Sequence, residues 1–209
     1  YLCTMGFNVS HANGRSFITN SHCTNTQGGV EGTTYYQPLS SVNPTVIATE
    51  AADPAYFKGG VCPKGRSCRW SDASRALYAS GTASNQGEIA KPLNTGGTLE
   101  VNGVFTITAQ DANTSSFATG TVVNKVGRTT GWSQGAVTNT CVHTNVSRSR
   151  FTQLCQTFVA AAVGSGDSGS PVFRITSGDN VTLVGILWGG SSDNRTFVFS
   201  PLKQIAQEL

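Results

Sequence analysis

The chain has 209 residues and a formal charge of +3, and only 12% of its residues are charged, about half the usual share. No run of Lys or Arg accompanies this small charge, so we expect no nucleic-acid partner. The longest apolar run, residues 158–163, is far too short to span a bilayer, so we expect a soluble monomer without membrane contact. Ser, Thr, Asn and Gly are abundant, which favours short strands and turns over long helices.

Six cysteines are present, and no pair of them has the spacing of a metal finger. An even number of cysteines in a turn-rich chain favours disulfides over a zinc site, and disulfides persist in oxidising compartments. We therefore expect the protein to be secreted and extracellular.

The first half of the chain begins with two predicted strands, residues 3–9 and 16–19. The turn between them, 11–15, contains Asn13-Gly14, a pair that favours positive φ. Ser21-His22-Cys23 follows the second strand, whereas His11 and His143 lie near turn residues, where a lone histidine is usually a surface group. His22 is therefore the histidine with a distinctive context.

Cys62 and Cys68 bracket a short basic loop that a local disulfide would close. A redox pair is the competing interpretation, but the spacing is not C-x-x-C, so we interpret the pair as structural. Further along, Gly96-Gly97 and residues 101–104 mark the limits of two more predicted strands. Residues 111–116 are expected to form an exposed link.

The second half begins with a predicted strand at 119–126. Cys141 and Cys155 flank a polar hairpin and are expected to bridge its two strands. The chain closes with a predicted helix, 200–209, with Ser200 as its N-cap and Pro201 in its first turn.

A glycine-rich stretch, residues 164–171, contains the most informative serine of the chain, Ser168. A serine hydroxyl is a poor nucleophile, so an enzyme that uses one needs a neighbouring base and amide donors for the developing oxyanion. Glycines on both sides of Asp167-Ser168 allow a sharp turn that would expose the N–H groups of Gly166 and Ser168 to one point.

Three other interpretations of this stretch have to be weighed. The dinucleotide pattern G-x-G-x-x-G is present, but it requires a following helix, and residues 170–176 read as a strand. The α/β-hydrolase pattern G-x-S-x-G fails because Ser170 replaces its last glycine. A plain glycine turn remains open for the stretch taken alone, so other parts of the chain must decide.

Taken together, the motifs resemble those of the chymotrypsin-like serine proteases. The resemblance is carried by residues 166–169, by residues 17–23 around His22, and by residues 3–7. It is strongest toward the secreted bacterial branch: residues 126–132 are similar to α-lytic-type proteases, and 184–190 to the glutamyl-endopeptidase group. It implies an all-β fold of two antiparallel six-stranded-type β-barrels with a C-terminal helix. We place the boundary so that residues 1–112 carry the base and acid and 113–209 carry the nucleophile.

The resemblance also implies the catalytic roles. Ser168 would be the nucleophile, His22 the base, and the amides of Gly166 and Ser168 the oxyanion hole. Asp72 is favoured as the acid because it precedes an apolar strand at about the position where the family places its carboxylate, and Asp53 is the next candidate. The remaining candidates for the acid between His22 and Ser168 are Glu31, Glu50, Glu88, Glu100 and Asp111. This chemistry requires no metal and no organic cofactor.

Further features follow from the same resemblance. It supports a Cys3–Cys23 disulfide, and it implies a cationic partner for a buried Asp167, for which Lys125 is the first candidate and Arg128 the alternative. The chain starts at Tyr1, just before Cys3, where the family usually has one more strand, so we expect a processed or truncated form.

The residue types near the expected specificity pocket predict what the enzyme would cleave. Ala162, six residues before the nucleophile, is not a carboxylate, which argues against cleavage after Lys or Arg. Leu187 stands where glutamyl-specific relatives carry a histidine, which argues against cleavage after Glu. The pocket residues expected from the resemblance are Ala162, Val163, Leu187, Trp188, Gly189 and Gly190.

The resulting prediction is a secreted serine endopeptidase that acts on proteins or peptides and prefers small to medium apolar residues before the scissile bond. The alternative is a catalytically silent relative that keeps the fold as a peptide-binding module. A thiol or metal protein that uses the cysteines is a third candidate.

Overall fold

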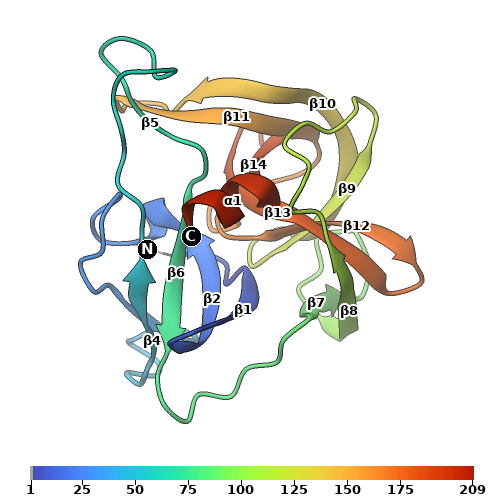
Figure 1. The fold of residues 1–209 in the computed structure, drawn as a ribbon. Coiled ribbons are helices and arrows are strands. Elements are labelled where there is room, and N and C mark those ends of the chain that lie inside the picture. Colours follow the sequence, from blue (N-terminus) through green and yellow to red (C-terminus); the bar gives the residue numbers. More distant parts are fainter. Residues whose placement is uncertain (1) are drawn as a thin grey trace.

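The computed structural model describes residues 2–209 as an all-β protein with one C-terminal helix, as predicted (Figure 1). Two β-sheets carry all the strands of this part of the chain. Within residues 2–209 no helix has both the length and the apolar character needed to cross a bilayer.

The first sheet has five strands in the order β1-β2-β6-β4-β3. Their bounds are Phe7–His11 (β1), Gly14–Asn20 (β2), Thr34–Tyr36 (β3), Val46–Ala52 (β4) and Ala73–Tyr78 (β6). The predicted hairpin forms between β1 and β2, and Gly14 at its turn has a φ of +122°. Phe17, Ala48 and Ala76 form a small buried core on this sheet.

The second sheet has nine strands, and six of them close into a ring. Pairings run β12-β9-β10-β11-β14-β13 and return from β13 to β12, and every one is antiparallel. The ring strands are Val122–Gly127 (β9), Gly131–Asn145 (β10), Phe151–Ala160 (β11), Pro171–Ser177 (β12), Asn180–Gly190 (β13) and Phe197–Pro201 (β14). A buried apolar cluster that includes Val123, Val159 and Phe199 packs within this half.

The other three strands join the ring from outside. They are Ser67–Arg69 (β5), Glu88–Pro92 (β7) and Val101–Gln110 (β8). β5 pairs with β11 and β8 pairs with β13, and both pairings are parallel rather than antiparallel as expected. β7 and β8 lie on the N-terminal side of the boundary predicted at residue 112, yet they belong to the second sheet. Pairing alone does not define domains, so the division into 1–112 and 113–209 stays a prediction.

The C-terminal helix α1 spans Leu202–Glu208, and its predicted N-cap is wrong. Ser200 belongs to β14, and no side chain caps the helix. The Ser200 hydroxyl is buried and instead bonds to Gln156 and to the backbone of Asp72. Tertiary partners therefore outcompete the local capping interaction.

The three predicted disulfides, Cys3–Cys23, Cys62–Cys68 and Cys141–Cys155, are all present, and residues 2–209 contain no free cysteine. The first links the segment before β1 to the residue after His22. The second closes the basic loop before β5, and the third joins β10 to β11.

Candidate active site

His22 lies in a short 3₁₀ turn, Ser21–Cys23, that ends β2. The backbone of this turn is joined directly to that of Asp72: the Ser21 N–H donates to the Asp72 carbonyl at 3.0 Å, and the Asn20 side-chain amide donates to the same oxygen at 2.9 Å. Since Asp72 directly precedes β6, which pairs with β2, the sheet register brings the two residues together.

The side chains of His22 and Asp72 are hydrogen-bonded. His22 Nδ1 donates to Asp72 Oδ2, and the carboxyl is 2% exposed while the imidazole is 33% exposed. A proton held on Nδ1 leaves Nε2 free to accept one. Burial lowers the pKa of His22, but the charge and the hydrogen bond of Asp72 outweigh it, so the pKa is raised above its ordinary value of 6.5. This is the electrostatic arrangement that a general base held by a carboxylate requires.

Asp53, the other carboxylate considered for this role, has different partners. It accepts hydrogen bonds from the Ser21 hydroxyl at 2.8 Å and the Gly28 amide at 2.9 Å, and it pairs with the fully buried Arg69 at 2.6 Å. Asp53 therefore supports the segment around His22 rather than the imidazole ring.

The second oxygen of Asp72 has a partner that the sequence did not indicate. Gln27 Nε2 donates to Asp72 Oδ1 at 3.1 Å and also lies 2.7 Å from the Tyr56 hydroxyl. Burial, followed by the nearby Asp72 charge, raises the pKa of Tyr56, which keeps the phenol neutral. No motif marks Gln27 or Tyr56, and only their positions beside Asp72 identify them.

The turn that carries Ser168 is held by Thr4. The Thr4 amide donates to the Ser168 carbonyl at 2.7 Å, and its hydroxyl donates to the Gly166 carbonyl at 2.9 Å. Gly169 has a φ of +94°, and a Cβ there would stand 2.1 Å from the Thr4 carbonyl oxygen, so only glycine fits. Thr4 follows Cys3, whose disulfide partner follows His22. A short covalent and hydrogen-bonded path thus joins the serine turn to the histidine turn.

The two expected oxyanion donors are unoccupied by internal acceptors. Gly166 has a φ of +100°, as the predicted sharp turn demands. Within residues 2–209 neither the Gly166 nor the Ser168 N–H donates a hydrogen bond to another protein group. Two neighbouring amides without internal acceptors are what an oxyanion site needs.

Asp167, between these two residues, is fully buried and pairs with Lys125, as hypothesised. Lys125 Nζ lies 3.0 Å from Asp167 Oδ2, and the carboxylate also accepts from Thr130 Oγ1 at 2.6 Å and from the amides of Thr129, Thr130 and Gly164. Burial opposes ionisation, but the Thr130 hydrogen bond and the Lys125 charge together lower the pKa of Asp167. Arg128, the alternative partner, forms no ion pair with it.

A hollow of about 210 Å³ lies beside Ser168. Four of the predicted pocket residues, Val163, Leu187, Gly189 and Gly190, line it together with Gly164, Ser165, Ser191 and Asn194, and none of these side chains is charged. Val163 packs closely against Gly190, because its Cγ1 lies 2.5 Å from where a Cβ on Gly190 would stand.

The two remaining predicted pocket residues lie elsewhere. Ala162 is exposed and does not line the hollow. The indole N–H of Trp188 donates to Gln156 at 2.7 Å, which directs that ring toward the buried network around Ser200. Their contribution to specificity stays a prediction.

Cys3, Cys23 and His22 bring potential metal-ligand atoms within 4.8 Å of one another. Both sulfurs are bonded to each other in the disulfide. Because the thiolate is the form of cysteine that binds metals, this group is not a metal site while the bridge is intact.

Comparison with solved structures identifies the fold. Thermobifida fusca Protease A is 22% identical, with a TM-score of 0.66 over 98% of this chain and 87% of its own. A glutamic acid-specific serine protease described as using a histidine triad in substrate binding is 21% identical, with a TM-score of 0.65 over 99% and 92%. Cellulomonas bogoriensis chymotrypsin is 22% identical, with a TM-score of 0.63 over 98% and 86%. No protein-family model and no curated protein sequence matches the chain. The chain therefore has the fold of the bacterial chymotrypsin-like serine proteases, as the resemblance in its sequence implied.

Proposed function

We propose that this protein is a secreted serine endopeptidase that uses Ser168, His22 and Asp72. The observation that carries the proposal is the hydrogen bond from His22 Nδ1 to the buried Asp72 carboxylate, in a fold in which Thr4 and the Cys3–Cys23 disulfide join that pair to the Ser168 turn. The protease names of the structural relatives agree with this chemistry.

In the proposed reaction, Ser168 Oγ attacks the peptide carbonyl carbon and its proton passes to His22 Nε2. The carbonyl oxygen becomes an oxyanion that accepts hydrogen bonds from the N–H groups of Gly166 and Ser168. His22 then gives the proton to the leaving amine as the C–N bond breaks, which produces an acyl-enzyme. Water repeats the sequence with His22 as base and releases the acid. Asp72 holds the imidazole tautomer and stabilises the imidazolium.

The hollow beside Ser168 supports a preference for small to medium apolar residues before the scissile bond. Val163 and Leu187 are buried and apolar, and no lining charge would pair with Lys, Arg or Glu. The small volume of the hollow, about 210 Å³, favours small to medium side chains over large ones.

Secretion is part of the proposal because three disulfides need an oxidising compartment to form and persist. The substrates are then proteins or peptides outside the cell.

Labelling with a fluorophosphonate probe tests the function, because only an activated serine reacts with it. We expect one adduct, located on Ser168 by mass spectrometry and absent from Ser168→Ala. Removing a triad serine costs on the order of 10⁶ in turnover, so hydrolysis of peptide substrates should disappear with the label. Folded wild-type protein that takes up no label would overturn the proposal and favour the silent peptide-binding module.

A further inference from the structure

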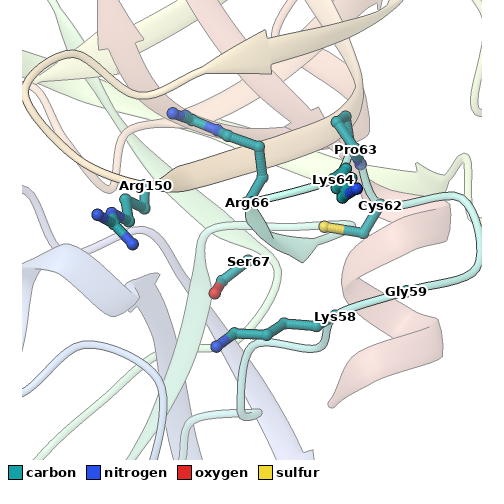
Figure 2. Close-up of a pocket in the computed structure, with 9 residues that line it drawn as sticks. Lys58, Gly59, Cys62, Pro63, Lys64, Arg66, Ser67 and Arg150 are labelled. Atoms are coloured by element: carbon teal, nitrogen blue, oxygen red, sulfur yellow. The ribbon is translucent and has the colours of Figure 1, made fainter.

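A second hollow, of about 400 Å³, lies between the loop that precedes β5 and the tip of the β10–β11 hairpin. We call it the basic hollow and define it by its lining residues Lys58, Lys64, Arg66, Ser67 and Arg150 (Figure 2). It lies outside the set of residues assigned to the candidate active site.

The positive charges of the basic hollow have no internal counterions. None of its lining residues is acidic, and within residues 2–209 no carboxylate pairs with Lys58, Lys64, Arg66 or Arg150. Lys58, Lys64 and Arg150 are exposed. Arg66 is held by the Ser149 carbonyl at 3.0 Å and the Thr152 hydroxyl at 2.9 Å, so its bonds are to neutral oxygens. The charges of Lys58, Lys64 and Arg150 remain available to an anionic ligand, whereas all three guanidinium nitrogens of Arg66 already donate hydrogen bonds within the protein.

The walls of the hollow are fixed relative to each other. The Cys62–Cys68 disulfide closes the loop on one side. On the other side, the Ser67 amide donates to the Arg150 carbonyl at 3.0 Å, where β5 begins its pairing with β11. A site whose walls are fixed in advance loses less entropy when it binds a ligand.

The cations are distributed around the hollow rather than gathered at one point. Figure 2 shows Lys58, Arg66 and Arg150 lying on different sides of Ser67, with Lys64 on the side away from Arg150. Its volume falls in the range of sites for ligands much larger than one small anion. We propose that the basic hollow binds an acidic segment of the peptide substrate, with several carboxylates placed against these cations.

A chain of contacts leads from the basic hollow to the candidate active site. Phe151, next to Arg150, stacks on Tyr56 with ring centroids 4.0 Å apart. Tyr56 shares Gln27 with Asp72. The occupant is assigned to the peptide substrate on charge complementarity, because a segment with several carboxylates matches cations that have no internal counterions. This choice of ligand rests on the proposed peptidase function, whereas anion binding by the hollow does not.

Binding is measured directly in the Ser168→Ala protein, so that the result does not depend on catalysis and the probe stays intact. A hexaglutamate peptide is titrated at low salt while the backbone amides are followed by NMR. We expect saturable shifts at Gly59, Gly65 and Ser67, with no comparable shifts from hexaglutamine. Binding should weaken as salt rises, since the contacts are between exposed charges.

A charge-removal variant, Lys58→Gln/Lys64→Gln/Arg150→Gln, leaves Arg66 in place because of its structural bonds. We expect its dissociation constant for hexaglutamate to rise about tenfold or more, as loss of several surface ion contacts implies. The matched control, Lys91→Gln/Arg174→Gln/Lys203→Gln, removes equally many positive charges elsewhere and should bind as the parent does. Amide spectra of both variants verify that each is folded.

Equal weakening in both variants would reduce the effect to net charge and overturn the proposal, as would saturable shifts confined to other amides. Inorganic sulfate tests whether a single small anion is enough to fill the hollow. If sulfate displaces the peptide at a concentration equal to the total concentration of peptide carboxylates, the hollow is a single-anion site and the acidic-peptide proposal is wrong. If the hollow binds the peptide but Ser168 of the wild type takes up no fluorophosphonate label, the anion-binding proposal stands and only the proposed catalytic function is wrong.

Discussion

The buried Lys125–Asp167 pair offers the sharpest test of how the Ser168 turn is built. Lys125→Met removes the ammonium group and keeps a side chain of similar length in a fully buried position. Asp167 would then be a buried carboxylate without its cation, in the residue between the two expected oxyanion donors, Gly166 and Ser168.

The magnitude follows from the contacts that remain. Removing one partner of a buried ion pair typically costs about 3–5 kcal/mol, because it leaves an uncompensated charge. Asp167 keeps one hydroxyl and three amide donors after the substitution, so we expect the lower end, about 3 kcal/mol. For a chain of this size that corresponds to a decrease in Tm of about 6–12 °C.

Urea unfolding and peptide hydrolysis are the assays. We expect the free energy of unfolding and kcat to fall together, since the same turn supports stability and the oxyanion donors. Lys203→Met, at a half-buried lysine outside any ion pair within residues 2–209, should change both by little. The double variant Lys125→Met/Asp167→Asn should lose less stability than the sum of the single changes. A Lys125→Met protein with unchanged stability and unchanged turnover would refute the assigned role.

Four further predictions concern the site itself. Because the pKa of His22 is raised and only the neutral imidazole acts as a base, kcat/KM should rise with pH through a midpoint above 6.5. Asp72→Asn should lower the pKa of His22, as measured by NMR of the imidazole ring. An unshifted pKa in that variant would contradict the pairing of His22 with Asp72. The same pair contributes stability that is fully present below pH 6.5 and is lost as pH rises through the raised pKa. Gln27→Leu removes a donor from the Asp72 carboxylate, so we expect kcat/KM to fall about tenfold and the pKa of His22 to rise further, whereas a purely structural role would leave that pKa in place. Val163→Gly should widen the hollow and raise kcat/KM for peptides with Phe before the scissile bond relative to Ala; a wild-type preference for Arg, Lys or Glu in a peptide library would show that the hollow has been misinterpreted.

Several parts of the candidate site could be predicted from the sequence because their causes are local. Glycines beside Asp167-Ser168 predicted the positive φ values at Gly166 and Gly169. The resemblance carried by residues 3–7, 17–23 and 166–169 implied the Cys3–Cys23 disulfide, and the structure contains it. Turn chemistry and disulfide spacing are readable because they depend on a few neighbouring residues.

Other features depended on pairing between distant strands, which leaves no local signal. Nothing near Gln27 in the sequence indicates that it bonds to Asp72. Ser200 has a typical position for a helix cap, yet its hydroxyl bonds to Gln156 because β14 places it inside the molecule. The basic hollow likewise exists only because β5 pairs with β11 and brings Arg150 to the 58–67 loop. The sequence by itself therefore indicated which residues are candidates for acyl transfer and how their turns would bend. The register between strands far apart in the chain decided which side chains lie beside those residues and which cations gather in the basic hollow.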